Sequence, residues 1–280
     1  MKISVVIVTF NSDKIIKNCL DSVYEAEEII IVENSNRKEF KENFENYKKN
    51  LKIILTGSNI GYGRGNNIGI KESKNDHVLI LNPDAVLAKN TINILKKTLF
   101  DKDFAIAAPE VNNNLSEINT LETLTDYNLI NVEYVKGFAM LIKKSKFKNF
   151  FFDENIFLYL EEIDLCKRAK LENENIFLVK NCFVQHYGAR SHNSEYNYEM
   201  ELSRNWHWMW SKFYYEKKYY GNINAYLKTL PNFFSAFFKY LIYFIIFNKK
   251  RLIYKMRFLG LLNSYLGKKS FYRPKLNENI

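Results

Sequence analysis

The chain has 280 residues, of which 47% are hydrophobic and 26% are charged, and its formal net charge is +10. This composition fits one large folded domain, or a domain with an extension, and it excludes an intrinsically disordered chain. The three cysteines are scattered and form no Cys-x-x-Cys pair, which fits a reducing compartment and argues against a disulfide framework or a zinc site.

Strands and helices alternate over the first hundred residues. The sequence predicts strands at 2–9, 28–33, 51–55 and 78–81 and helices at 13–25, 37–49 and 64–73. Continuous Val and Ile runs indicate strands that are covered on both faces, and strand–helix repeats predict parallel pairing. We therefore expect an α/β fold with a mostly parallel sheet flanked by helices. In such sheets the ligand crevice lies beyond the carboxyl ends of the strands.

The alternation ends after residue 100. Strands are predicted at 104–111 and 132–144, with a polar segment between them, and a helix is predicted at 161–173. A strand-like run, "FLVKNCFV" (177–184), then leads to His186.

Four places in this pattern hold residues that suit catalysis or binding. Asp84 follows a buried strand through Asn82-Pro83, where it could hold Mg²⁺ or Mn²⁺ or could simply be a turn aspartate. The stretch "NIGYGRGNNIGIK" (59–71) matches neither a phosphate loop nor the dinucleotide fingerprint. Its Arg64 could pair with a diphosphate, or the stretch could be a glycine-rich turn.

The third place is an acidic cluster, Glu161, Glu162 and Asp164, that follows the aromatic run "FLYL". Acids favour a helix N-terminus because of its dipole, but a carboxylate held beside Phe157 and Tyr159 could also serve as a general base. The fourth place is His186, which could be a metal ligand or a hydrogen-bonding loop residue.

Together these segments resemble the inverting glycosyltransferases of family 2, which have the GT-A fold. The resemblance covers about residues 1–215, and its motifs stand in the family's order. It is carried by seven segments: "SVVIVTFNS" (4–12), "IIIVENSN" (29–36), "NIGYGRGNNIGI" (59–70), "LILNPDAVL" (79–87), "VKGFAMLIKK" (135–144), "FLYLEEIDLCKR" (157–168) and "VQHYGARS" (184–191). The branch looks like enzymes that build bacterial surface polysaccharides, including rhamnosyltransferases.

The resemblance implies a role for each matching residue. A nucleotide-binding half (1–100) would contribute Thr9, Asn11, Glu33, Arg64, Asn66 and Asp84, and an acceptor half (101–215) would place Gly137 and Phe138 at the acceptor-side wall. Asp84 and His186 would hold a divalent cation, Mg²⁺ or Mn²⁺. Glu162 falls on the catalytic base, with Glu161 beside it. The donor would be a UDP- or dTDP-sugar, and the acceptor a glycan, itself lipid-linked.

Two other interpretations remain open. A nucleotidyltransferase would need a glycine-rich signature with Arg and Lys after the first strand, and "TFNSDKI" (9–15) lacks it. A non-catalytic membrane-bound scaffold of the same fold is disfavoured by the presence of Asp84, Glu162 and His186.

The positive charge is concentrated near the C-terminus. Residues 217–280 hold 13 Lys/Arg and one acidic residue, a net charge of +12, whereas residues 1–216 carry −2. This shift predicts a catalytic domain over 1–215 and a helical extension over 216–280.

The extension contains "FFSAFFKYLIYFIIF" (233–247), which is shorter than the roughly 20 apolar residues that span a bilayer. We expect an amphipathic helix on an anionic membrane surface, with the basic residues of 249–257 on the headgroups. A helix packed on the catalytic domain or in an oligomer is the alternative. No nucleic-acid motif accompanies the charge. No signal peptide is expected either, which predicts a cytoplasmic protein at the inner face of the membrane.

Overall fold

The computed structural model describes residues 1–35, 37–112, 129–148, 150–188 and 197–274. The chain forms two compact units, Met1–Asp153 with Glu162–Asn193, and Glu154–Glu161 with Ser194–Ile280. The boundary predicted at residue 215 falls inside a long helix of the second unit, α6 (Asn197–Ile245). The division into a catalytic domain and a membrane-associating extension therefore stays a prediction. In the structure the boundary between the two units lies nearer the N-terminus, between Asn193 and Ser194.

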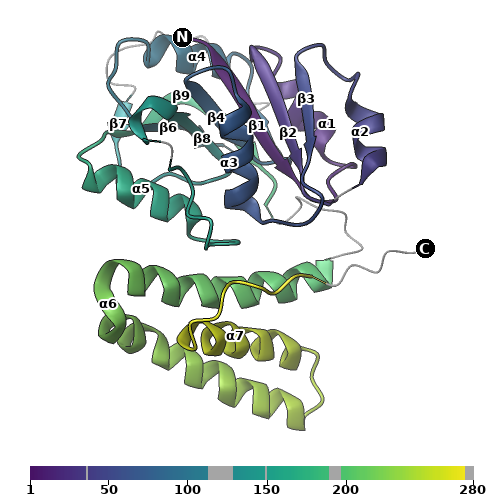
Figure 1. Ribbon diagram of the computed structural model, residues 1–280, viewed down its shortest axis with the longest axis vertical. Coiled ribbons are helices and arrows are strands. Elements are labelled where there is room, and N and C mark those ends of the chain that lie inside the picture. The colour runs from purple at the N-terminus through teal and green to yellow at the C-terminus, as the bar shows by residue number, and fades with distance from the viewer. Residues whose placement is uncertain (36, 113–128, 149, 189–196, 275–280) are drawn as a thin grey trace. The chain divides into compact units, whose positions relative to one another are not determined.

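The first unit is built on one mixed sheet (Figure 1). Its strands are β1 (Ile3–Thr9), β2 (Glu28–Glu33), β3 (Leu51–Leu55), β4 (His77–Leu81), β5 (Ala85–Leu87), β6 (Ile106–Val111), β7 (Leu129–Asn131), β8 (Ala139–Lys143) and β9 (Ile176–His186). Within the described residues they pair in the order β3-β2-β1-β4-β8-β6-β9-β5, and β7 pairs with β9. Strands β3, β2, β1 and β4 are parallel, while β8 is antiparallel to both β4 and β6. The predicted parallel half is thus confirmed.

Helices cover both faces of this sheet because both faces of its central strands are apolar. The helices are α1 (Ile16–Ser22), α2 (Lys38–Phe44), α3 (Tyr62–Glu72), α4 (Thr91–Thr98) and α5 (Glu161–Leu171). Val5 and Ile7 of β1 belong to a buried cluster with residues of α1, α2 and α4. Val6 and Val8 belong to a second cluster, with residues of α3 and α5. This alternation follows from the two-residue period of a strand.

Helix α3 contains most of the glycine-rich stretch and begins two residues before the helix predicted at 64–73. Gly61, with φ of 93°, precedes the helix. A Cβ on Gly69 would lie 2.3 Å from Cγ1 of Val6, and one on Gly65 would lie 2.9 Å from Cγ1 of Val8. These two glycines therefore allow α3 to approach β1 closely, and their role is packing.

The strand predicted at 132–144 is shorter in the structure. Strand β8 begins at Ala139, and residues 132–138 form an irregular segment with a turn at Gly137–Phe138. This segment leaves β7 on one side of the sheet and enters β8 beside β4. The segment therefore ends beside the carboxyl end of β4, where Ala139 pairs with Leu81 and a ligand crevice is expected.

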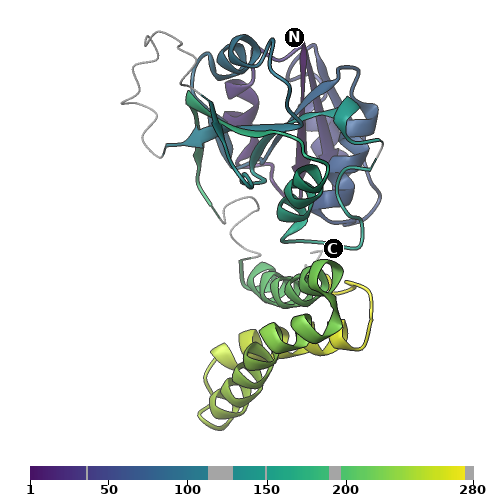
Figure 2. The same cartoon turned by 90° about the vertical axis from the view of Figure 1, so that its left-hand side faces the viewer.

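The second unit is helical (Figure 2 shows α6 and α7 side by side). Gly221, with φ of 79° and ψ of 171°, interrupts α6 and divides it into segments 197–220 and 222–245. Helix α7 (Lys250–Tyr265) packs against both, in an apolar cluster of Met209, Phe213, Ala225 and Leu261 with Phe233 and Tyr265. None of the helices described is long and apolar enough to cross a membrane.

Candidate active site

Asp84 and His186 meet at the end of the sheet. The turn Asn82-Pro83-Asp84 separates β4 from β5, and β5 pairs with the end of β9 so that Ala85 lies opposite His186. This register brings Nε2 of His186 to 3.3 Å from Oδ1 of Asp84. Asp84 is buried, and His186 is partly exposed. Two residues about a hundred positions apart are therefore adjacent, as the predicted cation site requires.

The surrounding polar atoms fit a divalent cation. Within the described part of the chain, the buried Oδ1 atom of Asn82 accepts no hydrogen bond, and Oδ1 of Asp84 accepts none beyond its 3.3 Å contact with Nε2 of His186. A buried acceptor without a partner costs free energy, which a bound cation would offset. Mg²⁺ binds through one or two carboxylates and completes its octahedron with phosphate and water oxygens. The described residues hold no cluster of three His, Cys, Asp or Glu, so most ligands would come from a bound diphosphate and water.

Phe138 holds the imidazole of His186 in place. The two rings stack with their centroids 4.1 Å apart and an interplanar angle of 11°. The backbone carbonyl of Phe138 accepts a hydrogen bond from the backbone N–H of Asn82 at 2.9 Å. Phe138 is therefore tied to both sides of the candidate cation site.

Gly137, the preceding residue, lies against Glu162. A Cβ built on Gly137 would be 3.1 Å from Cβ of Glu162 and 3.4 Å from its Cγ. The hydroxyl of Tyr62, on α3, donates a hydrogen bond of 2.7 Å to the carbonyl of Gly137. Two consecutive residues thus contact the predicted base and the predicted cation ligand, which the sequence placed in separate motifs.

The surroundings of Glu162 raise the affinity of its carboxylate for a proton. Burial raises the pKa of its carboxyl above the ordinary value of 4.5. The N–H groups of Glu162 and Ile163 at the start of α5, together with the positive charge of Lys136, lower the pKa in part. A carboxylate with a raised pKa binds a proton more readily, which is the property that general-base catalysis uses.

The other two acids of the cluster have different surroundings. Asp164 is buried and pairs with Arg168, with Oδ2 and Nε 3.0 Å apart. Arg168 also donates to the carbonyl of Phe150 at 3.0 Å, so this pair fixes α5 to the segment before it. Glu161 is buried and is grouped with the second unit. Of the three, Glu162 is therefore the carboxylate that packs against Gly137.

Three of the residues predicted to bind the nucleotide lie together at the ends of β1 and β2. The carboxylate of Glu33 is buried and accepts hydrogen bonds from the hydroxyls of Thr9 and Ser35 and from the backbone N–H of Ser35. Burial raises the pKa of Glu33, and these hydrogen bonds oppose the shift. Asn11 has φ of 52° and accepts a hydrogen bond of 3.2 Å from Arg37. In this arrangement Glu33 orients the rim residues around it.

Arg64 and Asn66 occupy different environments on α3. Arg64 is exposed, whereas Asn66 is fully buried and donates a hydrogen bond of 3.1 Å to the carbonyl of Tyr62. Their contact with a ribose or diphosphate stays a prediction.

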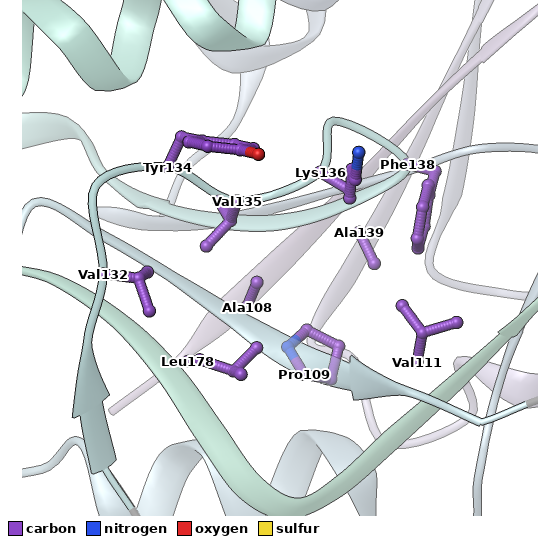
Figure 3. Close-up of a pocket in the computed structure, with 10 residues that line it drawn as sticks. All are labelled: Ala108, Pro109, Val111, Val132, Tyr134, Val135, Lys136, Phe138, Ala139 and Leu178. Carbon is purple, nitrogen blue, oxygen red and sulfur yellow. The ribbon is translucent and has the colours of Figure 1, made fainter.

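A small cavity opens beside the 136–138 segment (Figure 3). Its volume is about 230 Å³. The lining is apolar except for the side chains of Tyr134 and Lys136: Ala108, Pro109, Val111, Val132, Tyr134, Val135, Lys136, Phe138, Ala139 and Leu178. Because Phe138 is shared between this cavity and the His186 contact, the cavity adjoins the candidate cation site.

Sequence reasoning missed three side chains that hold the site together. Arg37 bridges Asn11 and Asp13, Tyr62 anchors Gly137, and Lys136 acts on the pKa of Glu162. Lys136 could have been suspected from its position next to Gly137. The long-range contacts of Arg37 and Tyr62 carry no local pattern in the sequence.

Comparisons with known proteins identify the family of this chain. Residues 4–166 match the family described as Glycosyl transferase family 2. A low-salt glycan biosynthesis hexosyltransferase, Agl10 of Haloferax volcanii, is 30% identical over 196 residues, 62% of this chain and 63% of that protein. The chain thus spans just under two thirds of this relative's length. The rhamnosyltransferase WbbL of Escherichia coli K12 is 24% identical, covering 68% of this chain and 85% of WbbL.

Solved structures show a similar fold. A mannosyltransferase from Pyrobaculum calidifontis, PcManGT, in complex with GDP-Man and Mn²⁺, has a TM-score of 0.58 at 12% identity, covering 96% of this chain and 88% of its own. Staphylococcus aureus TarS 1–349 has a TM-score of 0.54 at 15% identity, covering 100% and 98%. The GT-A fold that the sequence predicted is thereby confirmed.

Proposed function

The chain belongs to glycosyl transferase family 2, and we propose that it transfers a sugar from a nucleoside-diphosphate donor to an acceptor hydroxyl with inversion at the anomeric carbon. The observation that carries the proposal is the 137–138 pair. Gly137 packs against Glu162, and Phe138 stacks on His186, which lies 3.3 Å from Asp84. A base and a candidate cation site are thus held at opposite ends of one short segment.

The leaving group would bind at the Asp84 end. Asp84, His186 and the carbonyl oxygen of the Asn82 side chain would hold Mg²⁺ or Mn²⁺. A divalent cation bound there would neutralise charge on the departing diphosphate as a Lewis acid. Asp84 and Asn82 keep their buried oxygens available for that role. The mannosyltransferase PcManGT was solved with GDP-Man and Mn²⁺, which supports the choice of cation.

The nucleophile would be activated at the Glu162 end. The acceptor oxygen forms a bond to the anomeric carbon, the bond from that carbon to the diphosphate oxygen breaks, and Glu162 takes the hydroxyl proton. A single base that is separate from the leaving-group site suits one displacement, which inverts the configuration. General-base catalysis typically contributes about 10²–10⁴-fold to such a step.

The donor nucleotide would lie along the ends of β1 and β2. Thr9, Asn11 and Glu33 form the rim there, and Arg64 and Asn66 would approach the ribose and diphosphate from α3. The hydrogen bonds between Glu33 and its neighbours preorganise this rim. The donor would be a UDP- or dTDP-linked hexose or deoxyhexose.

The acceptor would reach Glu162 past Gly137 and Phe138. We place it among glycans that are built on a lipid carrier for bacterial surface polysaccharides, at the inner face of the cytoplasmic membrane. The similarity to Agl10, a hexosyltransferase of glycan biosynthesis, and to the rhamnosyltransferase WbbL supports the part of this proposal that makes the acceptor a glycan. The apolar cavity that shares Phe138 is suited to a nonpolar part of such an acceptor.

A panel of nucleotide sugars with Mn²⁺ tests the proposal. Release of the nucleoside diphosphate is measured for the full chain and for Asp84→Ala. We expect turnover of at least one UDP- or dTDP-sugar, and its loss in the variant. Absence of turnover and of nucleotide binding across the panel would favour a non-catalytic scaffold with the same fold.

A further inference from the structure

The second segment of α6 exposes apolar side chains along one side. Six of them form what we call the outer stripe: Ile223, Leu227, Phe234, Phe238, Leu241 and Ile242. Residues 223, 227, 234, 238 and 241 follow one another at intervals of three, four or seven, and Ile242 lies four residues after Phe238, so the six side chains share one face of a helix. The exposed fraction is 78% at Ile223 and 56% at Ile242. The stripe is about 30 Å long at 1.5 Å per residue, and exposed apolar surface of this extent marks an interaction site.

The opposite face of the same segment is already covered. Ala225 and Phe233 pack with Leu261 and Tyr265 of α7, and Phe237 contacts Phe258 with ring centroids 5.4 Å apart. The buried positions Ala225, Thr229 and Ala236 each lie two residues from a stripe position, which is about 200° around a helix of 3.6 residues per turn, so the buried and exposed sets point to opposite sides. Helix α7 therefore stabilises the segment without covering the stripe.

The stripe runs into an apolar tip followed by cations. Residues 244–247, "FIIF", are all exposed, and the exposed fraction of Phe247 is 83%. Asn248 is followed directly by Lys249, Lys250 and Arg251. An apolar face with adjoining Lys and Arg is the pattern of helices that lie in the interface of an anionic bilayer.

The charge distribution favours an anionic bilayer over a second copy of the chain as the partner of the outer stripe. Residues 217–280 carry 13 Lys/Arg and one acid. Two such surfaces placed face to face would repel each other, whereas anionic lipid headgroups complement them.

We propose that the outer stripe and the tip 244–247 dock this protein on anionic membranes, with α6 segment 222–245 lying in the plane of the interface and Lys249, Lys250 and Arg251 on the headgroups. The contact surface thus extends further toward the N-terminus than the apolar run 233–247. Membrane docking deepens the proposed function. The link between docking and a lipid-linked acceptor rests on that proposed function. The binding itself needs no catalysis.

The test is co-sedimentation of the full chain with phosphatidylcholine vesicles, with and without phosphatidylglycerol, at low and high salt. The stripe variant is Phe238→Ser with Ile242→Ser, and the tip variant is Ile246→Ser with Phe247→Ser. The matched control is Phe100→Ser with Leu171→Ser, because these side chains are more exposed than Phe238 and Ile242 but lie on the first unit. The charge variant replaces Lys249, Lys250 and Arg251 with Gln. Circular dichroism checks the fold of each.

We expect the stripe and tip variants to lose binding at both salt concentrations, while the control binds like the unmodified chain. The charge variant should lose roughly 10²-fold at low salt, because each basic residue contributes about fivefold near an anionic surface, and little at high salt. Unchanged sedimentation of the stripe and tip variants would overturn the proposal. So would a dimer in analytical ultracentrifugation that the stripe variant abolishes. Nucleotide-sugar hydrolysis without vesicles tests the proposed function separately.

Discussion

Substituting Gly137 with Ala places a methyl group against the proposed base and changes no polar group. The added Cβ would lie 3.1 Å from Cβ of Glu162 and 3.4 Å from its Cγ. Favourable carbon–carbon contacts are about 3.5–4.0 Å. Gly137 is not among the glycines with positive φ, so Ala is compatible with the backbone. The expected result is a shift of Glu162 by a few tenths of an ångström.

The size of that shift sets the expected loss of rate. A misplacement of about 1 Å costs up to about 10²-fold in active sites, so a few tenths of an ångström should lower kcat by about 3–10-fold. Affinity for the nucleoside diphosphate should not change, because the methyl group does not contact Asp84. Single-turnover hydrolysis of the donor sugar measures the rate, and calorimetry with Mn²⁺ measures the affinity.

Gly69→Ala serves as the control. Its Cβ would lie 2.3 Å from Cγ1 of Val6, between α3 and β1 and away from Glu162. Overpacking of this kind should destabilise the fold by about 1–3 kcal/mol and lower the melting temperature, while kcat per folded molecule is retained. If Gly137→Ala keeps its full kcat, Glu162 is not the group that reacts beside Gly137.

Three further predictions concern the same site. Glu162→Gln should retain donor binding and lose transfer by at least about 10²-fold, and Glu161→Gln should lose less. If steady-state rates show the larger loss in Glu161→Gln, Glu161 is the base. His186→Ala should weaken Mn²⁺-dependent binding of the nucleoside diphosphate in calorimetry and leave Mn²⁺-independent binding unchanged. An equal loss of both kinds of binding would argue against His186 as a ligand of the cation. Transfer should fall as the pH drops through the raised pKa of Glu162, because the base must be unprotonated. Lys136→Gln should move this acidic limb to higher pH in a pH–rate profile, since the positive charge of Lys136 lowers that pKa; a shift to lower pH would contradict the account.

The parallel half of the fold could be predicted from sequence because its signals are local. Val5, Val6, Ile7 and Val8 form a continuous apolar run, and both faces of β1 are indeed covered. The antiparallel half could not be predicted in the same way. Strand β8 pairs with β4 and β6, and the short β5 pairs with the distant end of β9, through contacts that leave no periodic pattern.

In the candidate site, too, some residues have a local signal in the sequence and others depend on long-range contacts. Asp84 and Glu162 could be proposed from the sequence because Asp84 follows a buried strand and Glu162 follows an aromatic run into a helix. The separate role of Asp164 could not be foreseen, because it depends on the position of Arg168 against the segment at Phe150. The packing role of Gly69 is likewise a property of how close α3 lies to β1.

The stereochemistry of donor hydrolysis tests the central claim most directly. Once a donor is found, proton NMR follows the anomer that is released first, for the full chain and for Glu162→Gln with Mn²⁺ present. We predict that an α-linked donor gives the β sugar first, and that Glu162→Gln slows its release without weakening donor binding. First release of the α sugar, or an unchanged rate in Glu162→Gln, would contradict a single inverting displacement assisted by Glu162.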